Sequence, residues 1–281
     1  MALPAHATSG EKVFYYGYRV IVAIIFFYLI FPLLTIIPLS FNSGELLSYP
    51  MQGFSFRWYE DFFGSGRWGL AIKNSLIIGL SSMVLATILG TAAAVGINRA
   101  DFPGKQIIVA LLISPMMIPL VITALSLYLF FGKFGLNNTY AGLILAHTIL
   151  GMPFVLITVS ATLQSFDYNL MRAGASLGAS PLRVFFKIVF PNIAPGIFSG
   201  ALFAFATSLD EVVVVMFIAG PSHRTIPRQM FSGIRENLSP TLLAAATVLI
   251  VFAGMLMLTL ELLRKRNEKY NSPPGGGGAA K

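Results

Sequence analysis

Hydrophobic residues gather in six long stretches of this chain, and shorter polar segments separate them. The stretches run from Val20 to Leu39, Ser75 to Ile97, Ile107 to Phe131, Ala141 to Leu163, Ile193 to Phe217 and Leu242 to Leu263. A helix needs about 20 mostly apolar residues to cross a bilayer, because its backbone must satisfy its hydrogen bonds internally. The pattern therefore predicts an all-α integral membrane protein with six transmembrane helices.

Composition supports this class. The 281 residues are 56% hydrophobic and 11% charged, whereas a soluble domain carries about 25% charged residues. A water-soluble protein is therefore excluded, and the lack of cysteine excludes disulfides and thiol chemistry. The net charge of +8 is spread thinly between apolar runs, so we expect no nucleic-acid partner.

Basic residues predict an orientation. If the N-terminus lies inside, twelve of the 19 Lys and Arg residues fall on the internal side, helped by Arg264-Lys265-Arg266. We therefore expect cytoplasmic termini, an N-terminal cytoplasmic segment over residues 1–19 and a transmembrane domain over residues 20–265. Residues 266–281, with two prolines and four consecutive glycines, are expected to form a disordered cytoplasmic tail.

A segment between the fourth and fifth stretches, residues 164–192, has a helical pattern of its own. One short helix is expected over Asp167–Leu177, ending at Gly178. A second is expected to begin with Ser180 as its N-cap and Pro181 as its first residue, and to end near Pro191. Small side chains along the first helix, such as Ala173 and Ala175, would let another protein approach closely. The sequence thus predicts a docking site for a cytoplasmic partner.

This segment resembles the EAA loop of binding-protein-dependent ABC-importer permeases. The resemblance rests on Arg172-Ala-Gly-Ala-Ser-Leu-Gly-Ala-Ser-Pro181, Phe185-Phe-Lys-Ile-Val-Phe-Pro191 and Ile193-Ala-Pro195-Gly196, with further matches at Ile72–Ser75, Leu89–Ala94 and Asn98-Arg99. Leu209-Asp-Glu-Val-Val213, Gly220-Pro221-Ser222 and Ile226-Pro227 resemble the spermidine/putrescine group in particular. The resemblance covers most of residues 55 to 265 and implies a type I ABC importer permease fold.

The resemblance implies that the loop is a coupling helix in a groove of an ATPase subunit. The residues expected to couple to the ATPase are Arg172, Ala173, Gly174, Ala175, Leu177, Gly178, Ala179, Ser180 and Arg183. Arg172 departs from the family pattern, because it replaces the acidic residue that names the motif. Gly178, the key glycine of the motif, is retained.

The family's architecture implies several partners in the bacterial cytoplasmic (inner) membrane. A second permease subunit would complete the path as a heterodimer, two ATPase subunits would use ATP and Mg, and an extracytoplasmic binding protein would deliver the solute. The chain itself has no phosphate-binding loop, since Gly104-Lys105 precedes Gln106 and Gly132-Lys133 precedes Phe134. We therefore expect a non-catalytic subunit that binds no cofactor or metal.

Two adjacent carboxylates interrupt the fifth stretch. Asp210 and Glu211 are costly in the hydrocarbon, so a residue of this pair is expected to face a cavity or a counter-charge. Adjacent residues on a helix point about 100 degrees apart, so at most one should face a path, and Asp210 is preferred. Thr207 and Ser208 would extend this polar path, which favours a cationic solute; a structural or hydrated role for the pair is the alternative.

Two further functions stay open from the sequence. The solute could be an amino acid, a betaine or a similar small molecule, since related permeases carry other cargo. The chain could also be a secondary transporter that works alone, although neither extra intramembrane charge nor matching half-repeats are evident in its sequence.

Overall fold

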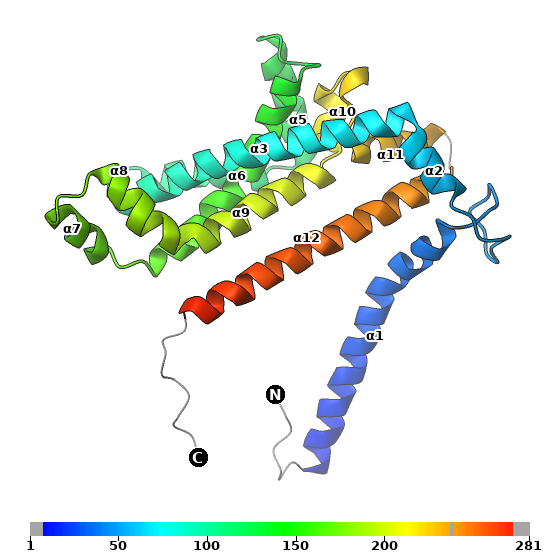
Figure 1. Cartoon of the computed structure of the whole chain (residues 1–281), viewed down its shortest axis with the longest axis horizontal. Coiled ribbons are helices and arrows are strands. Elements are labelled where there is room, and N and C mark those ends of the chain that lie inside the picture. The colour runs from blue at the N-terminus through cyan, green and yellow to red at the C-terminus, as the bar shows by residue number, and fades with distance from the viewer. Residues whose placement is uncertain (1–7, 237–238, 272–281) are drawn as a thin grey trace. The chain divides into compact units, whose positions relative to one another are not determined.

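The computed structural model describes residues 8–236 and 239–271, which are helical apart from turns, loops and one isolated bridge between Asn42 and Phe54 (Figure 1). These residues fall into two compact units. The first contains the chain up to Gly64 together with Gly233–Val251, and the second contains Ser65–Ser232 together with the residues from Phe252 onward.

The first unit begins with the long helix α1, Ser9–Leu39. A capping box starts it, because the Thr8 hydroxyl accepts from the Glu11 amide while the Glu11 carboxylate accepts from the Thr8 amide at 2.8 Å. Pro32 and Pro38 lie inside α1 without ending it, and no α1 residue is buried. The helix thus exposes apolar side chains around its circumference, as a membrane-embedded helix does.

A short helix, α2 (Arg57–Gly64), anchors the rest of the first unit. Trp58 is buried and donates its indole N–H to the Asn42 carbonyl at 2.6 Å. Asp61 accepts a hydrogen bond from the Thr241 hydroxyl at 2.7 Å, which ties α2 to the first residue of α12, Thr241–Asn271. Helix α12 extends beyond residue 265, where the disordered tail was expected to begin. Residues 272–281 of that expected tail lie outside the described residues.

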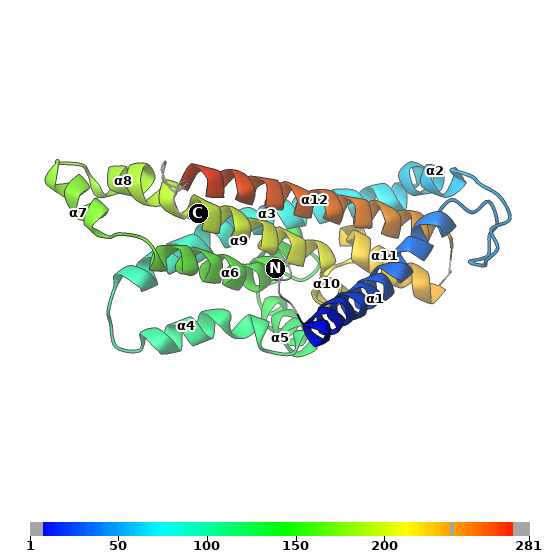
Figure 2. The same cartoon turned by 90° about the horizontal axis from the view of Figure 1, so that it is seen from below.

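Three long helices form the centre of the second unit. Helices α3 (Gly66–Arg99), α6 (Tyr140–Gln164) and α9 (Phe190–Asp210) lie side by side in both views (Figures 1 and 2). Small residues allow the close approach: a Cβ added at Gly151 would lie 2.9 Å from the Ala204 Cβ. Since lipid is as apolar as a leucine side chain, such close packing is a main source of attraction between membrane helices.

The third predicted span is not one straight helix. It comprises α4 (Lys105–Ile113), a 3-10 turn (Ser114–Met116) and α5 (Leu120–Gly132), and its two arms are bent by 101°. Pro115 lies in the 3-10 turn and Pro119 precedes α5. A proline supplies no backbone N–H and restricts the residue before it, so two of them four residues apart end one helix and start another. By contrast, Pro153 lies inside α6 without ending it.

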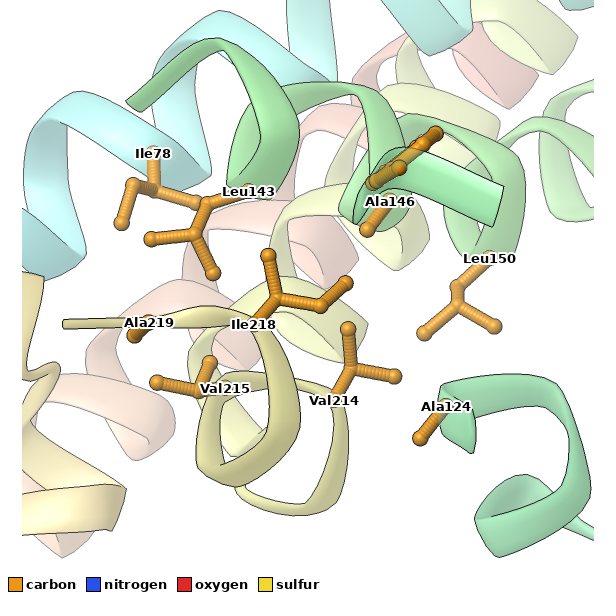
Figure 3. Close-up of a cluster of buried hydrophobic side chains, with 10 residues drawn as sticks. Ile78, Ala124, Leu143, Ala146, Leu150, Val214, Val215, Ile218 and Ala219 are labelled. Atoms are coloured by element: carbon orange, nitrogen blue, oxygen red, sulfur yellow. The ribbon is translucent and has the colours of Figure 1, made fainter. Parts of the chain in front are cut away.

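The fifth predicted span is also interrupted. Helix α9 ends at Asp210, and a separate short helix, α10 (Val213–Ile218), follows. Val214, Val215 and Ile218 of α10 pack into a buried apolar cluster, so α10 is part of the core (Figure 3). The other members of the cluster come from α3, α5, α6 and the residue after α10, and are Ile78, Ala124, Phe131, Leu143, Ala146, Leu150 and Ala219. The chain then continues through a 3-10 turn, Pro221–His223, into α11, Ile226–Glu236.

Within the described residues, five helices are long and apolar enough to cross a membrane, or up to six if the bent α4–α5 pair is one span. The five are Ser9–Leu39, Gly66–Arg99, Tyr140–Gln164, Pro181–Asp210 and Thr241–Thr259. The prediction of a multi-pass, all-α membrane protein is thereby confirmed.

Candidate functional site

The break between α9 and α10 separates the two neighbouring carboxylates. Glu211 has extended backbone angles and is buried, with 5% of the residue exposed. Its Oε1 atom accepts a hydrogen bond from the Val214 amide at 2.7 Å, so the carboxylate caps the first turn of α10. Glu211 therefore has a structural task, which the sequence alternative for the pair had allowed.

Asp210 has a different environment. It is the last residue of α9, it is exposed, and it has no Lys or Arg partner within 4.0 Å among the described residues. At the end of the helix the backbone carbonyls of the last turn are also without their usual partners. Asp210 is thus a free acidic group at a helix break, and its contribution to a solute path stays a prediction.

The two polar residues expected beside Asp210 do not share its exposure. Ser208 is buried, and its hydroxyl lies 2.6 Å from Nδ1 of His147 on α6 and accepts from the Ser82 hydroxyl of α3 at 3.4 Å. Thr207 is half-buried. Ser208 therefore joins α9 to two neighbouring helices, so its side chain faces the core in this structure. Of the four residues expected to line a path, Asp210 is exposed and Thr207 is half-buried, and a path along them stays a prediction.

The predicted coupling segment forms two helices at the opposite end of α9. The first is α7, Asn169–Ser176, and the second starts with α8, Pro181–Val184. Gly178 ends the α7 segment with φ of +78°, a left-handed conformation that glycine adopts without strain. Ser180 caps α8, since its hydroxyl accepts from the Arg183 amide at 3.4 Å. The local signals at Gly178, Ser180 and Pro181 are confirmed.

The expected end at Pro191 is wrong. A π-helical turn, Phe185–Val189, follows α8 and leads directly into α9, in which Pro191 is the second residue. The Phe190 amide donates to the Phe185 carbonyl, five residues earlier. This wider turn accommodates a proline that lacks an N–H, and π-helical turns of this kind often mark functional positions. Helix α8, the π-helical turn and α9 therefore form one continuous helical rod, Pro181–Asp210.

Most of the predicted coupling residues are exposed, with one clear exception. Gly174 is buried, because a Cβ at this position would lie 2.7 Å from Ile188 Cδ1. It permits α7 to pack against the following helix and does not belong to a free docking surface. Leu177 is 89% exposed. The other exposed members are Arg172, Ala173, Ala175, Gly178, Ser180 and Arg183, while Ala179 is half-buried.

One polar group was not expected from the sequence. The Asn74 side chain donates to the carbonyls of Ser222 and Arg224 at 2.9 Å each, and its oxygen accepts from the Tyr140 hydroxyl at 2.6 Å. These partners lie 66 to 150 residues away along the chain. No local pattern predicts such contacts. Within the described residues, no group of three or more His, Cys, Asp or Glu side chains could hold a metal ion.

Comparison with known proteins adds a second line of support. The family model for a binding-protein-dependent transport system inner membrane component matches residues 86–269. The chain is 34% identical over 245 residues to the spermidine/putrescine transport system permease protein PotC of Haemophilus influenzae, covering 87% of this chain and 95% of that protein. It is also 34% identical over 260 residues to the putrescine transport system permease protein PotI of Escherichia coli, covering 90% and 92% respectively.

Solved structures share the fold at lower sequence identity. A bacterial ABC transporter involved in the import of the acidic polysaccharide alginate matches with a TM-score of 0.69 and 14% identity, covering 96% of this chain and all of the matched one. The alginate transporter in complex with a periplasmic protein that holds an alginate pentasaccharide matches with a TM-score of 0.70 and 18% identity, covering 91% and 96%. The fold expected from the EAA-like loop is confirmed.

Proposed function

Because the chain belongs to the family of binding-protein-dependent transport system inner membrane components, we propose that it is one of two permease subunits of an ATP-driven importer of spermidine or putrescine. The similarity to PotC and PotI over most of their lengths supports the polyamine class. In this proposal an extracytoplasmic binding protein delivers the solute and a second, different permease completes the path.

The observation that carries the proposed substrate class is the environment of Asp210. Its carboxylate is exposed at the end of α9 and has no basic partner within 4.0 Å among the described residues. A carboxylate in or near a low-dielectric region attracts a cation more strongly than it would in water. Spermidine and putrescine carry separated ammonium groups, so one of them could pair with Asp210 during passage.

The exposed coupling surface supports ATP as the source of energy. Leu177 and Leu182, at 89% and 71% exposure, are apolar side chains that neither this chain's α7 nor its α8 covers. Arg172, Arg183 and Lys187, which belong to the same segment of the chain, are also exposed. Exposed apolar side chains together with arginine are typical of protein interfaces. In the proposal this surface contacts an ATPase subunit in the cytoplasm, and the ATPase binds ATP and Mg.

The same arrangement sets the proposed orientation. If α7 and α8 lie in the cytoplasm, α9 runs outward and the break at Asp210 and Glu211 lies toward the extracytoplasmic side. An even number of spans then leaves both termini inside, which agrees with the distribution of Lys and Arg. The chain is in this view a non-catalytic subunit of an assembly in the inner membrane.

A purification and a ligand screen test the proposal together. The affinity-tagged chain, extracted in mild detergent, is expected to carry a second permease and an ATPase in stoichiometric amounts. The binding protein of the same transporter is then heated with polyamines, amino acids and betaines. Spermidine or putrescine should raise its melting temperature, because a ligand that binds only the folded state stabilises it. A rise with amino acids or betaines alone would contradict the polyamine class, and purification without an ATPase would contradict the ATP-driven mechanism.

A further inference from the structure

The segment between α1 and α2, residues 40–56, is a hairpin that the proposed mechanism does not use (Figure 1). Its two arms are paired by the isolated bridge between Asn42 and Phe54. Beside this bridge, the Ser55 amide donates to the Phe41 carbonyl at 2.8 Å. The two arms therefore run antiparallel, and we call the segment the α1 hairpin.

A buried asparagine holds the α1 hairpin in a defined shape. The Asn42 side-chain oxygen accepts from the Gln52 amide at 3.0 Å and from the Gly44 amide at 3.3 Å. Its side-chain nitrogen donates to the Leu46 carbonyl at 3.3 Å, and its backbone carbonyl accepts from the Trp58 indole N–H at 2.6 Å. These bonds satisfy several backbone groups within the hairpin, so fewer of them need water as a partner.

The tip of the α1 hairpin, residues 46–51, folds back along α1. The Tyr49 hydroxyl donates to the Thr35 carbonyl at 3.0 Å. Thr35 lies one turn before Leu39, the last residue of α1, which at 1.5 Å per residue is about 6 Å back along the helix axis. The tip therefore reaches the level of the last turn of α1 and does not simply project beyond its end.

This turn of α1 belongs to a helix that suits lipid on every side. Ser9–Leu39 is long and apolar enough to cross a bilayer, and 0% of its apolar window is buried. Leu33 and Leu34, which precede Thr35 directly, are exposed. The lipid-facing surface of α1 therefore continues onto the tip of the α1 hairpin.

The composition of the α1 hairpin suits the same surroundings. The eleven residues from Leu46 to Phe56 include no Asp, Glu, Lys or Arg. On either side of this stretch, Glu45 and Arg57 are exposed and form an ion pair at 3.0 Å. An uncharged, apolar stretch between charged residues is the pattern of a segment that enters the membrane surface and leaves it again. Its exposed large hydrophobic side chains are Leu46, Leu47, Tyr49, Met51, Phe54 and Phe56.

Four aromatic rings form the base of the α1 hairpin. Phe41 stacks on Phe54 with ring centroids 5.1 Å apart, and Phe56 contacts both rings edge-on. Tyr59 packs on Phe41 at 4.9 Å, and its hydroxyl lies 2.6 Å from the Ser40 hydroxyl. Aromatic side chains are enriched at the level of lipid headgroups, where an apolar ring and a polar atom are both accommodated. The base of the hairpin therefore suits the boundary between headgroups and acyl chains.

We propose that the α1 hairpin is an interfacial anchor, whose tip contacts phospholipid at the boundary of headgroups and acyl chains beside the end of α1. The Tyr49–Thr35 hydrogen bond points the tip toward the bilayer, and the apolar side chains of the tip contact the lipid. A hairpin backbone does not enter the hydrocarbon fully, because its open edge leaves amides and carbonyls without partners there. The anchor therefore lies in the interface and fixes the depth of α1, whatever solute the protein carries.

Site-directed spin labelling tests the anchor, because the chain contains no cysteine and a single introduced thiol is unique in it. Leu46→Cys and Met51→Cys place a nitroxide at two exposed positions of the tip without disturbing Asn42 or Tyr49. Each labelled full chain is assembled with cysteine-free partner subunits in nanodiscs of phosphatidylethanolamine and phosphatidylglycerol. Collisions of the label with oxygen, which concentrates in lipid, and with a water-soluble nickel chelate are then measured. Both labels should collide mainly with oxygen and lie about 5–10 Å below the phosphate level.

A matched control carries the same label on α2. Glu60 is an exposed acidic residue of that helix, so a label at Glu60→Cys should collide mainly with the nickel chelate. The expected difference between the tip and this control is one of depth alone, since all three positions are exposed within one compact unit of the chain.

Two results would overturn the anchor. If the tip labels collide with the nickel chelate as often as the Glu60→Cys label does, the tip lies in water. If the tip labels are shielded from both oxygen and the nickel chelate, another protein chain covers the tip and phospholipid is not its partner. Labels that meet oxygen but not the nickel chelate support the anchor.

Discussion

Asp210 and Glu211 are neighbours in the chain, yet the helix break gives them separate tasks. The Glu211 carboxylate turns inward and caps α10, whereas Asp210 stays exposed at the end of α9. In a continuous helix the Val214 amide would donate to the backbone carbonyl of Asp210, four residues earlier, and would not be available to the Glu211 carboxylate. The Glu211 cap thus accounts for the start of α10, while Asp210 remains an exposed carboxylate whose contact with a solute is a prediction.

Removal of the Asp210 charge should weaken transport without harming the fold. Asp210→Asn keeps the size of the side chain but loses the attraction to a polyamine ammonium group. We expect spermidine uptake to fall at least about tenfold, equivalent to about 1.4 kcal/mol, as measured with radiolabelled substrate in membrane vesicles. The variant should still purify with its partners in normal amounts. Uptake at the wild-type level would exclude Asp210 from the path.

Glu211 should behave differently, because its task is a hydrogen bond. Glu211→Gln retains an oxygen that can accept from the Val214 amide, while Glu211→Ala removes the cap. Loss of a helix cap costs about 1 kcal/mol, so Glu211→Ala should lower the melting temperature of the purified complex and Glu211→Gln should lower it less. Equal melting temperatures for wild type and Glu211→Ala would contradict the capping role.

Sequence reasoning at this scale succeeded where a residue acts on its immediate neighbours. Ser180 as a helix cap and Gly178 as a helix end are local signals, and both are observed. It failed where the deciding contact is distant. Ser208 was expected beside a path, but His147, 61 residues away, holds it in the core. Gly174 was expected at a docking surface, but Ile188 packs against it.

The continuous rod from α8 through the π-helical turn to α9 connects two sites of the proposed mechanism. It runs from Pro181, beside the coupling surface, to Asp210 at the break. At 1.5 Å per residue, its 30 residues span about 45 Å. A movement imposed on the coupling segment would therefore reach the break without crossing a flexible loop. We expect α9 to transmit ATPase closure to the solute path.

Gly178 is the position in the coupling segment where a substitution should be most disruptive. A side chain there would be strained at φ +78°, by about 1–2 kcal/mol, and a large one would also project from the exposed surface. Gly178→Trp should therefore abolish copurification of the ATPase while the permease itself remains in the membrane. Gly96, an exposed helical glycine with open space around it, offers the control Gly96→Ala. Retention of the ATPase by Gly178→Trp would contradict the proposed docking.

Gly151 tests the packing of the three central helices. Its missing side chain allows α6 to approach Ala204 of α9, and a Cβ would already lie 2.9 Å from the Ala204 Cβ. Gly151→Leu should force the helices apart at a cost of about 1–3 kcal/mol and lower the melting temperature. Gly69, which has open space around it, supplies the comparison Gly69→Leu. Equal stability of the two variants would show that α6 and α9 are not closely packed there.

At the element scale, apolar stretches predicted where helices would lie but not where they would break. Pro115 and Pro119 lie at the bend between α4 and α5, yet Pro32, Pro38 and Pro153 leave their helices uninterrupted. At the α4–α5 bend two prolines act together, because Pro115 lies in the 3-10 turn and Pro119 directly precedes α5. The break after Asp210 contains no proline or glycine and depends on the Glu211 cap, so hydropathy alone could not reveal it.

Considered as a molecule, the second unit presents different chemistry at its two ends. Around α7 and α8 it exposes leucines and basic residues, whereas at the other end Asn74 ties the start of α3 to Tyr140 and to the segment that precedes α11. In the proposed mechanism the first end contacts the ATPase, and the α9 rod connects that end to Asp210 at the helix break.

The most direct test of this account is reconstitution of transport from purified components. Proteoliposomes containing the two permeases and the ATPase should accumulate radiolabelled spermidine only when binding protein is present on one side and ATP with Mg on the other. Proteoliposomes containing this chain alone should accumulate none, with or without an ion gradient. Spermidine accumulation by the chain alone under an ion gradient would contradict the account, because it would make the protein a self-sufficient secondary transporter.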